Sequence, residues 1–502
     1  MELDGTLLVG SVVVIAAVLF ARIGSKFGLP SLLLFLGLGL ALGESGLGIR
    51  FDDADLAHTL GFAALVLILT EGGLTTRWVE IKTALPVAGL LATAGIGISV
   101  GAMFLFGHYV LHLPAWTAVL LGAVCSPTDS AAVFSVLRKV PLPTRLRSML
   151  EAESGLNDAP TVLLVTAASA MATGESMTGG VLGFVANVGF ELIGGVLFGL
   201  VIGWLGVVVL RNVALPSSGL YPLTIMVWAV MAYAVAATLH TSGFAAVYVC
   251  AVLLGNGQLP HRQATKSFGE GIGWIAQIGL FVMLGLLADP GRITWHEVVI
   301  ALLAGVFLIM IARPLSVYLC AVWFKVPLPE QAFLAWAGLR GAVPIILATI
   351  PLVAGVAGAD FLFDVVLVFV VVFTLLQAPT LPWVARKLGL VVGAATDVEV
   401  EAAPLEGMKA DLIQVRVPEG SHLAGVEVSE LRLPANTVVS LIIRGEESFA
   451  PSGRTPLKIG DEVLVVAPAS KRAEVEERLR VVGKGGRLAK WRMNPLVDPE
   501  TD

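Results

Sequence analysis

Four polar side chains lie close together in the segment EAESGLNDAP, residues 151–160, inside an otherwise apolar stretch. Glu153, Ser154, Asn157 and Asp158 supply two carboxylates, a hydroxyl and an amide. If the segment is helical, Ser154 and Asp158 share one face, while Glu153 and Asn157 share the adjacent face. Each unpaired polar group in a bilayer core costs several kcal/mol. The segment therefore predicts an ion or proton path through a membrane.

Oxygen atoms are the ligands that hard cations prefer. Asp158 and Ser154 can offer oxygens to a bare cation, and the hydroxyl of Thr128 or a freed carbonyl can complete the shell. An ionised carboxylate alone at this depth is costly, so either a proton or a cation must neutralise Asp158. That competition is sufficient for exchange. Glu153 is expected instead to pair with a midplane arginine, with Arg313 favoured, and to hold the bundle together.

The composition places most of the chain in lipid. Of the 502 residues, 56% are hydrophobic and 14% are charged, against about 25% charged in ordinary soluble domains. The mean hydropathy is +0.87. At about 20 apolar residues per span, we expect about thirteen transmembrane helices, at residues 5–21, 30–47, 57–74, 84–106, 114–137, 148–171, 181–210, 222–239, 243–257, 271–288, 297–323, 331–354 and 361–385.

The loop charges predict the orientation. Loops after odd-numbered spans are basic, whereas loops after even-numbered spans hold only Arg50 and Arg292 together with seven acidic residues. The positive-inside rule therefore predicts an outer N-terminus and a cytoplasmic C-terminus. The basic residues are Arg22, Lys26, Arg77, Lys82, Arg138, Lys139, Arg145, Arg147, Arg211, Arg262, Lys266, Lys325, Arg386 and Lys387, and the acidic ones are Asp52, Asp53, Asp55, Glu175, Asp289, Asp360 and Asp364.

Five spans place charged residues in one zone of the membrane core. At about 1.5 Å per residue from the charged end of each span, four of them lie about 14–18 Å deep, near the midplane of a core about 30 Å thick. These four are Asp129, Asp158, Arg313 and Arg340. Glu71 and Glu153 lie about 9 Å deep, nearer the cytoplasm. Structural salt bridges would explain one or two such groups, but six with a surplus of acids indicate a cation site.

Two spans contain helix-breaking sequences, CSPTD at 125–129 and AGLRGAVP at 337–344. Pro127 and Pro344 free the carbonyls of Ala123 and Arg340, four residues earlier in each case. Broken helices seven spans apart are typical of inverted-repeat transporters, so spans 1–6 and 8–13 would form two repeats with crossed broken helices. Asp129 and Arg340 are placed to neutralise the half-helix ends, and for Asp129 a structural and a functional role remain equally open.

A second, soluble part follows the membrane region. We expect a membrane domain at 1–390, a linker at 391–403, a cytoplasmic α+β domain at 404–485 and a disordered tail at 486–502. The domain should contain strands at 411–417, 437–443 and 461–467 and a helix near 470–482. The three cysteines, Cys125, Cys250 and Cys320, have no metal-ligand spacing. We expect no cofactor, no enzymatic activity and no nucleic-acid partner.

Four segments in order resemble the monovalent cation:proton antiporter family, in the branch of bacterial NhaP-type proteins and eukaryotic sodium/proton exchangers. They are SPTDSAAVFSVLR (126–138), ESGLNDAP (153–160), LHTSGFAAVYVCAVLLGN (239–256) and AGLRGAVPIILA (337–348). The resemblance implies a homodimer that works by alternating access, in which Asp158 carries cation and proton. It also implies that Ser154 and the Thr128 region are ligands and Asn157 shapes the site. Glu71 would line the cytoplasmic funnel, and the Asn-Asp pair implies electroneutral exchange.

The soluble part resembles a TrkA-C domain, through its VPEGSHLAG opening and its IGDEVLVVAP ending. This resemblance implies regulation of transport by a small ligand such as a nucleotide. The pairing of this domain with the antiporter part implies a protein of the bacterial inner membrane with a role in pH homeostasis. It favours K⁺ over Na⁺ as the exchanged cation, while a Na⁺/H⁺ antiporter stays open. A TrkA-C-regulated channel is the rival from another class, but the chain has no filter sequence such as TVGYG.

Overall fold

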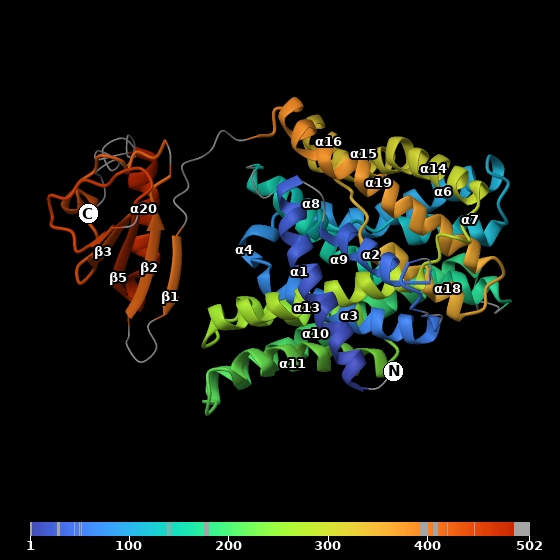
Figure 1. Cartoon of the computed structure of the whole chain (residues 1–502), viewed down its shortest axis with the longest axis horizontal. Coiled ribbons are helices and arrows are strands. Elements are labelled where there is room, and N and C mark those ends of the chain that lie inside the picture. The colour runs from blue at the N-terminus through green and yellow to red at the C-terminus, as the bar shows by residue number, and fades with distance from the viewer. Residues whose placement is uncertain are drawn as a thin grey trace, which may run out of the picture. The chain divides into compact units, whose positions relative to one another are not determined.

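The fold was taken from a computed structural model, which describes residues 3–27, 31–44, 46–49, 51, 53–137, 140, 142–174, 180–391, 400–404, 410–418, 420–445 and 447–485. The chain forms two compact units, Met1–Val391 and Val392–Asp502 (Figure 1). The basic residues Arg50, Arg138 and Lys139, the acidic Asp52 and Glu175, and the predicted tail lie outside the described residues, as does most of the predicted linker.

All the regular secondary structure in the described part of the first unit is helical. In the described part of the chain, seven helical segments are long and apolar enough to cross a membrane, and five further apolar helices have 10–17 residues. Each of the thirteen predicted spans contains a described helix. The helices are α1 (Leu3–Phe27), α2 (Ser31–Leu42), α3 (Ala54–Thr75), α4 (Trp78–Ile81), α5 (Leu85–Leu90), α6 (Ile96–Tyr109), α7 (Ala115–Cys125), α8 (Ser130–Leu137), α9 (Thr144–Ala172), α10 (Gly180–Asn212), α11 (Leu220–Thr238), α12 (Gly243–Asn256), α13 (Arg262–Leu287), α14 (Trp295–Phe307), α15 (Arg313–Ala321), α16 (Leu328–Trp336), α17 (Ala342–Leu347), α18 (Thr349–Val353) and α19 (Ala359–Lys387).

Several helices begin at a residue that satisfies their first backbone N–H groups. The side chain of Asp53 accepts a hydrogen bond from the Leu56 amide at 2.8 Å, and that of Ser242 accepts one from Ala245 at 3.3 Å. These N-caps open α3 and α12, and each is worth about 1 kcal/mol. They set where the two helices start, and α3 and α12 then pack against one another.

The two predicted breaks are present, and they meet. The first separates α7 from α8 at residues 126–129, and the second separates α16 from α17 at residues 337–341. The backbone N–H of Asp129 donates to the carbonyl of Leu339 at 2.7 Å, so each break satisfies a backbone group of the other. By contrast, α9 runs through Pro160 without a break, although a proline removes one helical hydrogen bond.

Two further spans are interrupted by π-helical turns. Residues Leu91–Gly95 join α5 to α6, and residues Leu308–Ala312 join α14 to α15. They occupy the fourth and eleventh predicted spans, which are also seven apart. The second π-turn ends directly before Arg313 and Pro314, and a proline cannot donate the usual helical hydrogen bond. The paired irregularities agree with a two-repeat architecture.

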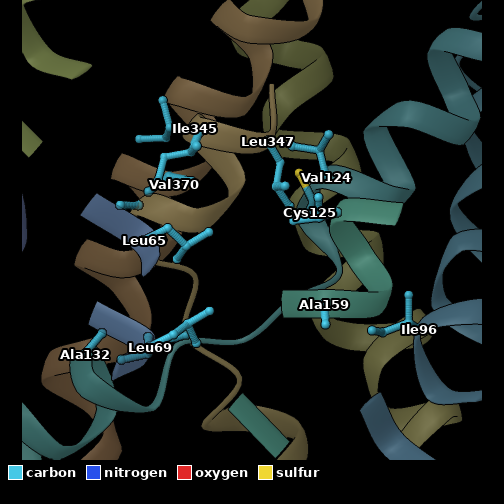
Figure 2. Packing of buried hydrophobic residues seen from close by; sticks show 14 of the residues in the cluster. Leu65, Leu69, Ile96, Val124, Cys125, Ala132, Ala159, Ile345, Leu347 and Val370 are labelled. Carbon is cyan, nitrogen blue, oxygen red and sulfur yellow. The ribbon is translucent and has the colours of Figure 1, made fainter. Parts of the chain in front are cut away.

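The short helix α17 is buried among three longer elements. Its residues Ile345 and Leu347 belong to one apolar cluster with Leu65 of α3, Val124 of α7 and Val370 of α19. Figure 2 shows Leu347 beside Val124. All five side chains are almost fully buried. Because α17 has only six residues, its position depends on this packing rather than on its own helical stability.

The second unit is a five-stranded antiparallel sheet in the order β1-β2-β5-β3-β4, with the helix α20 (Arg472–Gly485) packed against it (Figure 1). The strands are β1 (Val400–Pro404), β2 (Ala410–Arg416), β3 (Val438–Arg444), β4 (Glu447–Phe449) and β5 (Glu462–Pro468). Burial alternates along β5, as expected for a sheet with one covered face. The buried carboxylate of Asp461 pairs with Arg444, with an N–O distance of 2.8 Å.

The strands at 411–417, 437–443 and 461–467 and the helix near 470–482 were predicted, but β1 and β4 were not. Residues 400–403, predicted as linker, belong to β1, which pairs with β2 along its whole length. Such a pairing depends on a partner strand and leaves little trace in the short sequence VEAAP. The linker prediction is therefore wrong at its C-terminal end.

Candidate cation site

One cavity of about 340 Å³ brings together five of the six residues that the sequence nominates for cation binding. They are Glu71 of α3, Thr128 and Asp129 of the first break, and Ser154 and Asp158 of α9. Asn157 does not line this cavity. Carboxylate and hydroxyl oxygens from three elements thus face one space, a ligand set suited to a hard cation.

Asp158 is the residue in this cavity whose environment most needs a positive partner. Its side chain is buried, and within the described part of the chain its Oδ1 atom has no hydrogen-bond partner. A buried carboxylate oxygen without a partner is costly. A bound proton or a bound cation would remove that cost, so the geometry suits Asp158 to hold either.

Asn157 lies behind the cavity and ties α9 to the first break. Its Nδ2 donates to the carbonyl and to the hydroxyl oxygen of Thr128, both at 3.1 Å. Both residues are buried. Asn157 therefore lies where it positions Thr128, which fits the expected role of shaping the site, although its side chain does not line the cation cavity itself.

The expected structural pair has Arg313 as its basic partner. The Glu153 carboxylate meets the Arg313 guanidinium through two contacts of 2.6 and 2.9 Å, and the two side chains are 3% and 4% exposed. Bidentate geometry is the strongest form of such a pair. The contact joins α9 to α15 behind the cavity. Arg340 instead donates to backbone carbonyls, those of Cys125 at 3.2 Å and of Gly338.

The charges at the two breaks match the helix ends that they contact. The Asp129 carboxylate accepts a hydrogen bond from the Ala132 amide at 3.3 Å, at the N-terminal end of α8. A Cβ atom at Gly341 would collide with this carboxylate, so Asp129 also lies against the N-terminus of α17. Arg340 contacts the last carbonyl of α7. Acidic groups at N-termini and a basic group at a C-terminus are the stabilising arrangement, and Asp129 has this role in addition to lining the cavity.

The cavity runs from the surface to the buried carboxylate. Arg147 and Thr75 line it and are exposed, whereas Thr128 and Asp158 line it and are buried. Its mouth therefore lies beside the C-terminal end of α3 and the N-terminal end of α9. The same ends carry the basic residues that predict a cytoplasmic location.

Among the cavity residues that the sequence did not nominate are Arg147, Glu151, Tyr248 and Gln277. Glu151 belongs to the segment EAESGLNDAP and is bound by Arg147 at 3.0 Å. The Tyr248 ring lies so close to Gly155 that a Cβ there would collide with it, which explains a glycine between Ser154 and Leu156. Gln277 is the one amide side chain in the predicted span 271–288. An isolated polar residue of this kind is the clearest sequence signal that α13 contributes to the cavity.

One outer-loop assignment is also corrected. Asp364, counted from sequence among the loop charges, lies in the second turn of α19 and is buried. Its carboxylate receives two hydrogen bonds from Arg292, both at 3.1 Å. Pairing with a loop arginine is what allows a carboxylate to be buried there.

A membrane-embedded helical bundle with two interlocked broken helices beside a buried carboxylate defines a secondary cation transporter. Residues 12–387 match the sodium/hydrogen exchanger transmembrane family, and residues 412–480 match the TrkA-C domain. The chain belongs to the sodium/hydrogen exchanger family: it is a cation/proton antiporter that carries a C-terminal TrkA-C domain. Both resemblances noted in the sequence are thereby confirmed.

Two curated relatives match over more than nine-tenths of this chain, and a third matches over 60% of it. The K⁺/H⁺ antiporter NhaP of Alkalimonas amylolytica is 34% identical over 469 residues, which are 92% of this chain and 81% of the relative. The K⁺/H⁺ antiporter NhaP2 of Shewanella oneidensis is 34% identical over 482 residues, 93% and 81% of the two chains. The Na⁺/H⁺ antiporter NhaH of Halobacillus dabanensis is 28% identical over 314 residues, 60% and 76%. All three are transporters.

A solved structure shares the fold. The sodium proton antiporter MjNhaP1 from Methanocaldococcus jannaschii superposes with a TM-score of 0.64 at 21% identity, covering 76% of this chain and all of that one. A second structure of the same antiporter gives 0.66 at 22% identity, covering 77% and 98%. The expected antiporter architecture is confirmed at the level of the fold.

Proposed function

We propose that this protein exchanges K⁺ for H⁺ across a bacterial inner membrane, one for one, by alternating access. The observation that carries the proposal is the buried Oδ1 of Asp158, without a hydrogen-bond partner in the described part of the chain, in a cavity with Ser154 and Thr128. Asp158 binds the proton and the cation in turn, and Ser154 and Thr128 supply further oxygens. Asp129 and Glu71 line the path, while Glu153 and Arg313 hold α9 in place.

The competition at Asp158 makes the exchange obligatory. A cation that enters the cavity displaces the proton, and a proton that enters displaces the cation, because the buried carboxylate needs one positive charge and not two. The neighbouring position holds the amide Asn157 rather than a second carboxylate. One titratable group in the pair supports one proton per cation and hence electroneutral exchange.

Potassium is the proposed cation because two relatives that match over nine-tenths of this chain are K⁺/H⁺ antiporters. A Na⁺/H⁺ antiporter is the second candidate, since NhaH and MjNhaP1 carry that description. The cavity oxygens do not separate the two ions, because both are hard monovalent cations that take oxygen ligands.

The orientation follows from loop charge. Basic residues flank the inner ends of the odd-numbered spans, which supports a cytoplasmic C-terminus and an outer N-terminus. On this orientation the cavity mouth beside Thr75 and Arg147 opens to the cytoplasm, so the conformation is inward-facing. Hydrophobic side chains of α3 and α13, among them Leu65 and Phe281, line the cavity away from the mouth.

The second unit is proposed to regulate transport. We place its start at β1 rather than at residue 404, and propose that it binds a small ligand, such as a nucleotide, within a homodimer. The TrkA-C match over residues 412–480 supports the regulatory role. The homodimer rests on the family resemblance noted in the sequence.

Everted vesicles with a pH-sensitive dye test the function. Dequenching on addition of K⁺ or Na⁺ is titrated separately for the full chain, for a chain ending at Val391 and for Asp158→Asn. We expect a response at lower K⁺ than Na⁺, no response for Asp158→Asn, and an altered K⁺ dependence without the second unit. A response to neither ion in the full chain, with protein present in the membrane, would contradict antiport.

A further inference from the structure

We propose that Thr374 and Gln377 of α19 are positioning residues for cation exchange, because they hold the second helix break at the place where it supports the first. This inference rests on the proposed function of Asp158 and its cavity. It assigns a role to polar side chains of the last span that do not line the cavity.

The first contact satisfies a carbonyl that a proline leaves without a helical donor. Pro344 has no N–H, so the Arg340 carbonyl cannot receive the usual helical hydrogen bond. The Thr374 hydroxyl donates to this carbonyl at 2.9 Å, and its side chain is buried. Buried membrane threonines commonly bond a carbonyl of their own helix, as Thr70 does to Val66 at 2.7 Å. The Thr374 hydroxyl instead donates its hydrogen bond to a carbonyl of the second break.

The second contact lies at the other end of the same break. Gln377 Nε2 donates to the carbonyl of Trp336, the last residue of α16, at 3.0 Å, and Gln377 is buried. The Trp336 indole in turn donates to the Thr380 hydroxyl at 3.1 Å. Helix ends leave carbonyls without partners, so α19 fixes both edges of the unwound segment with residues spaced three apart on one face.

The held segment contacts the first break directly. The Leu339 carbonyl accepts from the Asp129 amide, and Arg340 Nε donates to the Cys125 carbonyl. A Cβ at Gly338 would lie 3.2 Å from Thr128 Cγ2, so this glycine packs against Thr128. Thr128 and Asp129 both line the cation cavity. A displacement of the second break therefore moves oxygens of the first.

The internal repeat supplies a second reason. The first break lies in the fifth span and the second in the twelfth, and each is bonded from the last span of its own repeat. Asn157 of α9 holds the Thr128 carbonyl, and Thr374 of α19 holds the Arg340 carbonyl. In both repeats a side chain of the last span bonds a carbonyl of the break, which separates this contact from an incidental hydrogen bond.

The test measures K⁺-driven proton movement in proteoliposomes for Thr374→Val, Thr374→Ser and Gln377→Leu. Thr70→Val is the matched control, because Thr70 is equally buried and its hydroxyl bonds its own helix. Loss of one hydrogen bond should raise the KM for K⁺ roughly three- to ten-fold in Thr374→Val and Gln377→Leu. Thr374→Ser should keep the wild-type KM, and melting temperatures in detergent should fall equally in Thr374→Val and Thr70→Val.

Wild-type KM values in both Thr374→Val and Gln377→Leu would overturn the inference, as would an equal KM rise in Thr70→Val or a failure of Thr374→Ser to restore the KM. If the variants melt early and cannot be reconstituted, K⁺ binding to protein in detergent at low temperature gives the same comparison. A wild-type protein that moves no protons on K⁺ addition would instead refute the proposed function, so the two failures are distinguishable.

Discussion

The two helix breaks are built alike and used differently. Each contains or precedes a proline, each carries one charged residue against helix ends, and each is bonded from the last span of its repeat. The first break contributes Thr128 and Asp129 to the lining of the cation cavity. The second break contributes no lining residue, and only Ala342 and Val343, which directly follow it, line the cavity. Asn157 is followed by Asp158, but Thr374 is followed by Leu375. The first repeat therefore carries the titratable carboxylate of the cavity. The second supplies the fixed charge of Arg340 and contacts that position the first break, and we call the contacts that position the cation site its frame.

The largest effect should come from Asp158→Asn, which leaves the frame intact and removes the titratable group. Because an amide can hold neither a proton nor a cation in exchange, K⁺-driven proton movement in proteoliposomes should be abolished. The melting temperature in detergent should fall little or rise, since the unpaired buried oxygen is no longer charged. Full retained exchange would assign the chemistry to another residue.

Glu153→Gln should lower the stability of the protein more than it changes K⁺ binding. It leaves Arg313 buried beside a neutral partner, and breaking a buried pair in this way costs about 3–5 kcal/mol. The measurement is the free energy of unfolding in detergent. Arg77→Gln is the control, because the Arg77–Glu80 pair is exposed and should contribute at most about 1 kcal/mol. An unchanged stability together with lost K⁺ binding would reverse the roles of Glu153 and Asp158.

Gly341→Ala should disturb the contact between the two breaks. Its Cβ would collide with the Asp129 carboxylate, and overpacking of this kind costs about 1–3 kcal/mol. We expect weaker K⁺ binding, measured by calorimetry in detergent, because Asp129 must move. In Gly279→Ala the new methyl meets open space on α13, so stability should be equal or higher. Equal K⁺ affinity in both variants would show that the breaks can shift independently.

Asp461→Asn should have the smallest effect on exchange, since it lies in the second unit. Burial by itself raises the pKa of Asp461, but hydrogen bonds and charge from Arg444 and Lys458 outweigh it and lower the pKa overall. The Asp461–Arg444 pair therefore stabilises this unit at pH values above the ordinary carboxyl pKa. This contribution to stability is lost as the pH falls through the lowered pKa of Asp461. The variant should lose about 1.5–3 kcal/mol at neutral pH.

Hydrogen exchange of β3 and β5 measures that loss. At neutral pH, protection of both strands should fall in Asp461→Asn, while the difference between wild type and variant should shrink at strongly acidic pH. The KM for K⁺ of the membrane unit, measured at the same pH, should change less than in any variant at the breaks. A larger change in the KM for K⁺ than in Gly341→Ala would show that the second unit helps to position the residues of the cation site.

Much of the first unit could be predicted because its causes are local. Prolines at 127 and 344 locate the breaks, and isolated charges in apolar spans identify Asp158 and the Glu153–Arg313 contact, since a buried charge needs a partner. The contacts of Thr374 and Gln377 could not be predicted, because threonine and glutamine in a span usually bond their own helix. The strands β1 and β4 depend on partner strands, and the burial of Asp364 depends on Arg292, which is distant in sequence.

The central claim is that proton and cation compete for Asp158. Adding K⁺ to purified protein in unbuffered solution, with the released protons counted against the K⁺ bound, tests it most directly, because binding that displaces a proton must acidify the solution. We predict about one proton released per K⁺ bound in the wild type and none in Asp158→Asn. K⁺ binding to the wild type without proton release, or undiminished release from Asp158→Asn, would contradict the account.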